Sequence, residues 1–350
     1  MFGSIVDDSL DAFYRGLLDS SLRQFFSRKA PMTLLLTREE TQPLLDLATA
    51  VDLTEAAHRE QAAGQVTAHA PYHVHVNGQQ ALRVVSGALL GSRRMGIRLG
   101  PNSQLSGETM IALLYGSESG SLLSIMGYPF GTLRTAAAVA LAARYLARAD
   151  SKTVGLFGIG RNALGLVKGI ASLCRLEKVV VSSRDAERRK TFCQEAAQEL
   201  RLEVVSADKP EQAVKKMDII LTATNSPSPV FPVEWLEPGM HVSSMGKPTE
   251  LSDVVYLKAD RVVIGCREHE QNYWDRACLH PLVELDADGR LPWSKVPEMG
   301  DLVAGRAPGR QSAAEITVFK ESQGGFGDVA FAAWLYEEAR RRGLGQKINF

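Results

Sequence analysis

The amino-acid sequence predicts an α/β protein with two domains: an N-terminal α+β domain built on an antiparallel sheet, and a Rossmann-type domain with a doubly wound parallel sheet. Residues 153–157 form a short apolar run of the kind that a buried parallel strand needs, and a glycine-rich turn and an apolar helical pattern follow it. Residues 72–126 contain two pairs of alternating segments instead, which is typical of hairpins in an antiparallel sheet. The length of 350 residues suits about two domains.

The N-terminal part is expected to begin with an amphipathic helical extension over residues 1–30, followed by a short strand over residues 32–36. Thr37 and Glu40 have the spacing of a capping box, which predicts a helix from that point through Leu47.

Two hairpins are predicted in the antiparallel sheet. Asn77-Gly78 separates the alternating residues 73–76 from residues 82–85, and this dipeptide is the strongest short hairpin signal. Residues 110–115 and 122–126 flank a second turn.

An alanine- and leucine-rich helix over residues 136–149 leads into the strand before the glycine-rich turn. In this turn Gly158 permits the tight bend, Gly160 lets a pyrophosphate approach the backbone, and small Ala163 lets helix and strand pack closely. The N–H groups at the start of the following helix favour phosphates. An ordinary strand-to-helix turn is the alternative, but the flanking strand and helix favour a dinucleotide. The candidate contacts are Gly158, Gly160, Arg161, Asn162 and Ala163.

The strand that ends at Val181 indicates which dinucleotide is bound. An NAD-selective site carries an acidic residue at this point for the ribose 2′-OH, whereas this chain has Ser182, Ser183 and Arg184. Hydroxyls and a guanidinium suit a 2′-phosphate, so Ser183 and Arg184 predict NADPH rather than NAD. Asp185 has the position of a helix N-cap. A solvated loop position for Arg184 is the alternative.

The nucleotide-binding region continues with further predicted elements, namely strands at residues 203–206, 218–225, 241–245 and 261–264 and a helix at residues 210–217. Ligands of such sheets bind beyond the carboxyl ends of the strands. The candidate contacts with the nicotinamide half of the cofactor are therefore Thr222, Thr224, Asn225 and the strand end that includes Met245 and Gly246. Polar turns after core strands account for these residues equally well.

The chain ends in a predicted strand over residues 316–319 and a helix over residues 329–341, which we expect to pack back on the first domain. The predicted organisation is a helical extension (1–30), a first domain (31–130 together with about 315–350) and an NAD(P)-binding domain (131–314).

Composition excludes several classes of partner. Lys plus Arg and Asp plus Glu number 40 each, which favours neither nucleic acid nor an anionic membrane. No apolar run approaches the roughly 18 residues of a membrane-spanning helix, and the N-terminus lacks a signal-peptide pattern. The four cysteines are too few and scattered for a disulfide framework, and Cys266, His269, Cys278 and His280 fit no common zinc spacing. We therefore expect a reduced, cytoplasmic protein without a metal.

Several motifs resemble those of the ornithine cyclodeaminase/mu-crystallin family. They occur in the family's order from about Met32 onward, and they are GTLRTAA (131–137), ATNS (223–226), WLEPG (235–239), GRAPGR (305–310), EITVFK (315–320) and Asp328. The resemblance implies an NAD(P)-dependent Rossmann domain, an N-terminal domain that builds the substrate site and a homodimer interface, and chemistry on amino acids or their imines.

The family's site residues match this chain unevenly. Arg134 matches the arginine that the resemblance implies beside the substrate carboxylate or the cofactor. Arg98 stands where the family has an active-site lysine, and it keeps the charge but cannot exchange a proton near neutral pH. His73 stands in place of an arginine and is a candidate proton donor, although a histidine in a strand is more often structural. Ser322 matches the serine after the Phe-Lys pair, displaced by Glu321.

Residues 245–251 lack the aspartate that the family often carries there, which argues against true ornithine cyclodeamination. We therefore expect an NADPH-preferring oxidoreductase that acts on a small imino, keto or amino acid, in a homodimer. Its arginines Arg98 and Arg134 are expected to share one anion, either a substrate carboxylate or a cofactor phosphate. The alternatives are an NADPH-binding protein of mu-crystallin type with little catalysis, and an amino-acid lyase or synthase that uses transient oxidation by bound NAD.

Overall fold

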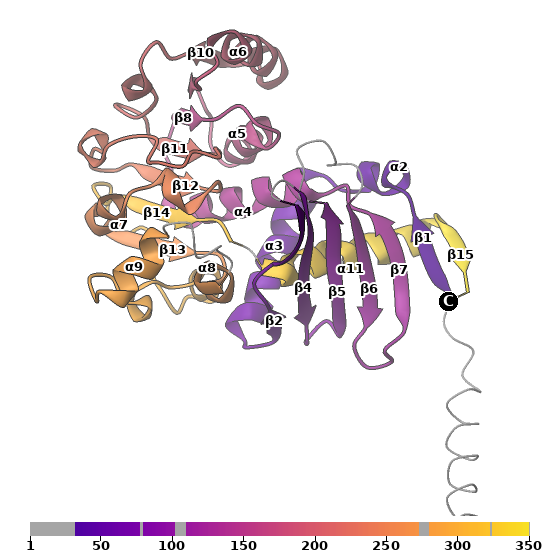
Figure 1. Ribbon diagram of the computed structural model, residues 1–350. Helices are drawn as coiled ribbons and strands as arrows, with labels where there is room; N and C mark the ends of the chain where they lie inside the picture. Colours follow the sequence, from indigo (N-terminus) through magenta and orange to yellow (C-terminus); the bar gives the residue numbers. More distant parts are fainter. Residues whose placement is uncertain (1–31, 78–79, 102–109, 273–279, 323, 350) are drawn as a thin grey trace, which may run out of the picture.

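The computed structural model describes residues 32–77, 80–101, 110–272, 280–322 and 324–349. The predicted extension over residues 1–30 lies outside them. Two sheets stand side by side, each with its own helices (Figure 1). The predicted fold class is confirmed: one sheet is parallel throughout, and the other is mainly antiparallel.

The first sheet has the strand order β15-β1-β7-β6-β5-β4-β2, and β3 pairs with β4. Its strands are β1 (Thr33–Leu36), β2 (Val66–Ala68), β3 (Tyr72–Asn77), β4 (Gln80–Leu89), β5 (Arg94–Pro101), β6 (Ile111–Gly116), β7 (Leu122–Gly127) and β15 (Gln346–Ile348). Both predicted hairpins are confirmed, because β3 pairs antiparallel with β4 and β6 pairs antiparallel with β7.

One face of this sheet is covered by α11 (Gly324–Arg342), which crosses β4 to β7 in Figure 1, and α3 (Leu47–Ala62) packs on α11. The start of α11 lies against the backbone of β4, since a Cβ on Gly325 would be 1.9 Å from the Ser86 carbonyl oxygen. Glycine is therefore required for this contact. We call the covered face the inner face and the opposite one the outer face.

The capping box at Thr37 and Glu40 is confirmed, but the predicted long helix is not. The helix α2 (Arg38–Thr41) passes into a 3-10 turn that contains Pro43, and Asp46 then caps a separate helix, α3. Proline removes a backbone donor and clashes with the preceding turn, which explains the break.

The second sheet has the order β10-β9-β8-β11-β12-β14-β13. Its strands are β8 (Thr153–Phe157), β9 (Lys178–Ser182), β10 (Glu203–Ser206), β11 (Ile219–Thr222), β12 (His241–Ser244), β13 (Arg261–Ile264) and β14 (Thr317–Lys320). From β8 the chain first adds β9 and β10 on one side of the sheet, and it then returns to add β11 on the other side of β8. This reversal of strand order is where doubly wound sheets bind ligands.

The helices of the second domain are α5 (Ala163–Ala171), α6 (Ala186–Leu200), α7 (Asp253–Lys258), α8 (Arg267–Asn272), α9 (Pro281–Ala287) and α10 (Met299–Val303). The helix α4 (Gly131–Leu146) packs on both α3 and α5 and so connects the two halves. The helix predicted over residues 210–217 is only a 3-10 turn, Pro210–Ala213.

The second domain extends past its predicted end near residue 315 and includes β14. Residues 316–319 were expected in the first domain, but β14 pairs in parallel with β12 and β13 in the second sheet. The C-terminal helix α11 does return to the first sheet, as expected. The chain thus leaves the second sheet after β14, which places Lys320 and Ser322 close to the start of α11.

Candidate active site

The glycine-rich turn has the features that a dinucleotide requires. Gly158 has φ +95°, and a Cβ there would lie 2.6 Å from the Ala223 carbonyl oxygen, so glycine is needed for the turn itself. A Cβ on Gly160 would have no neighbour within 4 Å, so space for another group is left at this backbone. The two glycines therefore differ in their surroundings in the way that the sequence prediction requires.

The helix α5 begins directly after this turn. Ala163 is fully buried, and a Cβ on Gly169 would lie 2.7 Å from the Ala136 carbonyl oxygen of α4, so the two helices are in close contact. The Asn162 amide donates to Met245 Sδ at 3.9 Å, which brings the turn beside the end of β12. Arg161 is exposed.

The end of β9 carries the residues that were predicted to select NADPH. Ser182 is buried, Ser183 is half-buried and Arg184 is exposed. Asp185 caps α6, with its Oδ1 accepting from the Arg188 N–H at 3.0 Å, which confirms the predicted cap. The Arg189 guanidinium donates to the Ser183 carbonyl oxygen and anchors this end of the strand.

The carboxyl ends of β11 and β12 are organised by Glu250, which has no assigned role in the sequence prediction. The buried Thr222 hydroxyl and the Gly246 N–H both donate to Glu250 Oε2 at 2.9 Å, and the Thr224 N–H donates to Oε1. Burial raises the pKa of Glu250, although the hydrogen bonds from Thr224 and Thr222 act to lower it. The Thr222 side chain, predicted as a nicotinamide contact, thus serves the fold, and Glu250 sets the positions of Thr224 and Gly246.

A second buried group joins the arginines. Asp328 of α11 accepts from Arg98 Nε at 2.9 Å and from the Tyr128 hydroxyl at 2.6 Å, and its Oδ1 lies 3.1 Å from Arg134 Nε. The side chains of Arg98 and Asp328 are less than a tenth exposed, and that of Arg134 is 12% exposed. The convergence of Arg98 and Arg134 is as predicted. The anion between them was expected to be a substrate carboxylate or a cofactor phosphate, but in the structure it is the carboxylate of Asp328.

Electrostatics explain why this cluster is stable. Burial alone would raise the pKa of Asp328, but the Arg134 and Arg98 guanidinium groups hold it below its ordinary value. Burial raises the pKa of Tyr128 to about 12, so its hydroxyl stays protonated and donates. The charge of Glu321 also acts on Arg134 and raises its pKa.

His73 lies on β3 directly opposite Arg83 of β4. The two therefore share the inner face. His73 stacks on His75 with ring centroids 6.0 Å apart. Burial, followed by the charge of Arg83, lowers the pKa of His73. The sequence prediction did not include Arg83, because only the strand register shows which face it occupies.

The end of β14 brings a further group of polar residues to the first sheet. Ser322 is buried, and its hydroxyl accepts from the Cys266 N–H at 3.3 Å, which supports the turn after β13. Lys320 donates to the Gly246 carbonyl oxygen at 3.1 Å. The pKa of His269 is lowered to about 3, chiefly by burial; the charge of Glu270 opposes this shift, and the charges of Arg83, Lys320 and Arg134 add to it. Arg83 of the first sheet and Lys320 of the second sheet thus both act on His269.

The predicted absence of a metal site concerns residues that are only partly described. Cys278 lies outside the described residues, and His280 Nε2 pairs with Glu270 Oε2 at 2.9 Å. Across the described ranges no group of three or more metal-ligating side chains is found. In the same ranges, the helices are all too short or too polar to cross a membrane.

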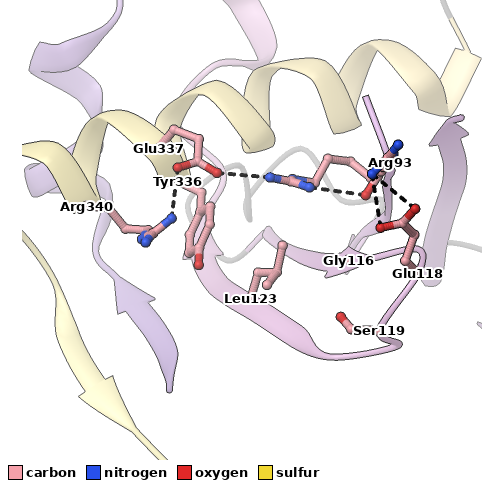
Figure 2. A pocket seen from close by; sticks show the side chains of 9 residues that line it. Arg93, Gly116, Glu118, Ser119, Leu123, Tyr336, Glu337 and Arg340 are labelled. Carbon is pink, nitrogen blue, oxygen red and sulfur yellow. Dashed lines mark hydrogen bonds and ion pairs between the residues drawn. The ribbon is translucent and has the colours of Figure 1, made fainter. Parts of the chain in front are cut away.

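A cavity of about 330 Å³ lies elsewhere, at the start of β5 beside α11 (Figure 2). Arg94 bonds Glu337 at 3.0 Å there, and Arg93 pairs with Glu118 at 3.2 Å. These arginines are thus matched by carboxylates. Nine residues of helix separate Glu337 from Asp328, which is about 13 Å. The cavity is therefore distinct from the candidate site.

The sequence model of the ornithine cyclodeaminase/mu-crystallin family matches residues 32–343. The chain belongs to this family. Among its members, the Δ1-pyrroline-2-carboxylate reductase of Bacillus cereus is 29% identical over 289 residues, which cover 78% of this chain and 86% of the relative.

Two solved structures of the family agree with the fold. The Δ1-pyrroline-2-carboxylate reductase of Thermococcus litoralis, in complex with NADH and L-proline, has a TM-score of 0.81 at 25% identity, covering 90% of this chain and all of that one. An archaeal alanine dehydrogenase dimer with bound NAD has a TM-score of 0.80 at 27% identity, covering 91% and 99%.

Proposed function

We propose that this family member is an NADPH-preferring oxidoreductase that reduces an imino or keto acid, or oxidises the corresponding amino acid, by hydride transfer. The observation that carries the proposal is the buried pair Arg98 and Arg134, which Asp328 holds side by side. An acid is the substrate class that such a pair suits. The activities named for the relatives, reduction of pyrroline-2-carboxylate and dehydrogenation of alanine, support the same class.

The residues at the turn fit a nicotinamide dinucleotide. The open position at Gly160 and the start of α5 would hold its pyrophosphate. When bound, the dinucleotide supplies or accepts the hydride. Thr224 and Gly246, placed by Glu250, and Met245 beside Asn162 would border its nicotinamide half, with Ser322 beyond them.

The protein's own part in the reaction is binding, orientation and proton transfer. Arg98 and Arg134 would hold the substrate carboxylate, and Asp328 fixes both guanidinium groups. Arg98 keeps its proton throughout, so a different group must exchange one. His73 is our candidate. Because its pKa is lowered, its imidazole is neutral at pH 7 and suited to accept a proton in the oxidative direction.

A substrate panel tests this function. The purified protein is mixed with NADPH and a series of cyclic imino acids, or of keto acids with ammonia, and NADPH oxidation is followed by absorbance. We expect oxidation with at least one acid and none with the matching neutral ketones. NADPH that stays bound and unoxidised across the panel would overturn the function. We also expect no proline from ornithine, since Arg98 replaces the lysine and residues 245–251 contain no aspartate.

The preference for NADPH predicts a selective loss in one variant. Arg184→Ala is expected to weaken NADPH binding about 10- to 100-fold and to leave NADH binding nearly unchanged, because a charge-assisted contact is worth roughly 1.5–3 kcal/mol. Nicotinamide fluorescence titration measures both affinities. Lys190→Ala, an exposed change on α6, is the matched control. Equal affinity for the two cofactors in the unmodified protein would contradict the assignment.

The two glycines of the turn are expected to respond differently to alanine. Gly158→Ala introduces a clash at a positive φ and is expected to lower the free energy of unfolding by roughly 1–3 kcal/mol. Gly160→Ala meets no neighbour in the chain and should keep full stability while weakening dinucleotide binding. Urea unfolding and cofactor titration of both variants separate the effects. Loss of stability in Gly160→Ala would contradict the proposed role of the open space.

We also propose a homodimer formed through the outer face of the first sheet. Cross-strand pairing places Tyr72, Val84, Leu99 and Ile111 in one row on this face. Tyr72 is 66% exposed, and the other three are half-buried. A contiguous apolar face of this kind marks an interface. Light scattering at micromolar concentration is expected to give the mass of a dimer, and Leu99→Lys should shift it toward a monomer.

A further inference from the structure

Lys320 is a buried cation at the carboxyl ends of the strands in the second sheet. It is the last residue of β14, and only 1% of its surface is exposed. A lysine is almost never buried to this extent unless it is paired. Its ammonium donates to the Gly246 carbonyl oxygen at 3.1 Å, and the Glu321 carbonyl oxygen is 3.5 Å away. Two uncharged acceptors compensate a buried charge only in part, so an opposing charge nearby is needed.

Glu250 supplies that charge from the other side of Gly246. It is fully buried, and its Oε2 accepts from the Gly246 N–H at 2.9 Å. Burial raises the pKa of Glu250 and the charge of Lys320 acts to lower it, so the two charges interact across this glycine. The carboxylate thus holds the N–H of Gly246, and the ammonium holds its carbonyl oxygen. We call these three residues the Gly246 clamp.

The Gly246 clamp joins the segments that follow three strands. Glu250 also accepts from the N–H of Thr224, which follows β11, and Gly246 follows β12. A Cβ on Gly246 would lie 2.3 Å from the Thr224 carbonyl oxygen, so these two segments are in direct contact. Lys320 ends β14 and adds the third segment. Ligands of doubly wound sheets bind beyond such strand ends, and the nicotinamide half of the dinucleotide is expected here.

We propose that Lys320 is a positioning residue for the nicotinamide half of the cofactor and that it acts through Gly246. Because its side chain is buried, it acts by holding the Gly246 carbonyl oxygen and by opposing the charge of Glu250. Without the ammonium, the carboxylate is buried without its opposing charge, and the segment after β12 is held from one side only. The pyrophosphate depends on the turn at Gly160 instead, so its binding is spared. This inference rests on the proposed function, and it adds the residue that fixes the place of the reacting ring.

Equilibrium binding separates the two halves of the cofactor. Isothermal calorimetry compares NADPH with 2′-phospho-ADP-ribose, which lacks only the nicotinamide, and NADH with ADP-ribose in the same way. The ratio of the two affinities in each pair measures the contribution of the nicotinamide. We expect Lys320→Met to lower this ratio about 10-fold and to leave the affinity for the nicotinamide-free ligand within a factor of about two. Lys320→Arg keeps the charge and should retain part of the ratio. An unchanged ratio in Lys320→Met, or an equal loss for both ligands of a pair, would overturn the inference.

Glu250→Gln tests the Gly246 clamp from its other side. The substitution keeps the size of the side chain and removes its charge, and we expect the same selective loss. If the two charges act as a pair, the double variant Lys320→Met/Glu250→Gln loses no more of the ratio than either single variant. Losses that multiply in the double variant contradict the clamp, because the two residues then act independently. Thermal unfolding identifies any variant that does not fold, and Glu250→Gln with Lys320→Arg decides the question if Lys320→Met is one of them.

An exposed lysine of the same domain is the matched control. Lys258 also donates to two backbone carbonyl oxygens, those of Val233 at 3.1 Å and Leu236 at 2.8 Å. Because Lys258 is exposed, Lys258→Met should change neither affinity. A fall of the ratio in both lysine variants would show that the effect is not specific to Lys320.

Turnover distinguishes this inference from the proposed function. With the best acid of the panel, we expect Lys320→Met to lower kcat about 10- to 100-fold, because the reacting ring is misplaced. The KM for the acid should change little, since Arg98 and Arg134 are retained. If no acid oxidises NADPH but Lys320→Met still lowers the binding ratio, the proposed function fails and the clamp stands. If acids are reduced while Lys320→Met changes neither kcat nor the ratio, the function stands and the clamp fails.

Discussion

Asp328→Asn is expected to produce the largest loss of stability of any single change in the site, about 3–5 kcal/mol in the free energy of unfolding. The substitution keeps the shape of the side chain and removes the charge, so Arg98 and Arg134 remain buried beside each other without a carboxylate. Breaking a buried ion pair on one side leaves uncompensated charge, which accounts for this magnitude. Urea unfolding at neutral pH measures it.

The matched control lies on the same helix. Glu337 also pairs with an arginine, Arg94, but its side chain is 49% exposed. Ion pairs that solvent reaches contribute about 0–1 kcal/mol, so Glu337→Gln should change stability little. Equal losses of stability in Asp328→Asn and Glu337→Gln would show that the buried ion pairs of Asp328 contribute no more than an exposed pair.

Acid titration provides an independent check of the same group. The pKa of Asp328 is lowered in the folded protein, so its contribution is fully present above the unfolded value of about 3.9. The contribution is lost as the pH falls through the folded pKa. Asp328→Asn should therefore lack this part of the loss of stability in acid, while the unmodified protein shows it.

Arg134→Met is expected to have the largest effect on turnover, a fall in kcat/KM of about 10- to 100-fold or more for the acid substrate. The guanidinium would contact the substrate carboxylate, and a charge-assisted hydrogen bond is worth roughly 1.5–3 kcal/mol. Arg134→Lys should recover only part of the activity, because lysine lacks the planar fork. Steady-state kinetics with NADPH and the best acid of the panel measure both variants.

A second arginine of α4 is the control for this experiment. The Arg144 side chain is 42% exposed and pairs with Glu55, at the other end of the helix. Arg144→Met should leave kcat/KM within a factor of about two. A similar fall in both variants would show that α4 tolerates no change rather than that Arg134 binds substrate.

Much of the fold is predictable because its signals are local. The turn at Gly158 and Gly160 and the capping box at Thr37 each depend on a few adjacent residues. The hairpins are equally local, since strand alternation and turn chemistry act over about ten residues. The interruption of the helix after Thr41 is also a local effect, and Pro43 is the residue that could have predicted it.

The rest depends on contacts between distant parts of the chain. Asp328 is 230 residues from Arg98, and nothing in the sequence around either residue indicates that they meet. Arg83 acquires its place only through the register of β3, β4 and β5. The position of β14 between β12 and β13 likewise follows from the assembled sheet. For Asp328 the available signals are its match to the family's acidic residue and its place within an otherwise small and apolar helical segment.

In the proposed reaction a hydride passes between a nicotinamide cofactor and a small acid. The most direct test uses NADPH that carries deuterium in the transferable position of C4, together with the best imino or keto acid of the panel, and mass spectrometry of the product. We predict an amino acid that is heavier by one deuterium, formed in equal amount with NADP⁺. An unlabelled acid recovered beside intact, bound cofactor would contradict the claim in favour of a binding protein. A converted product with no net change in the cofactor would contradict it in favour of a lyase or synthase.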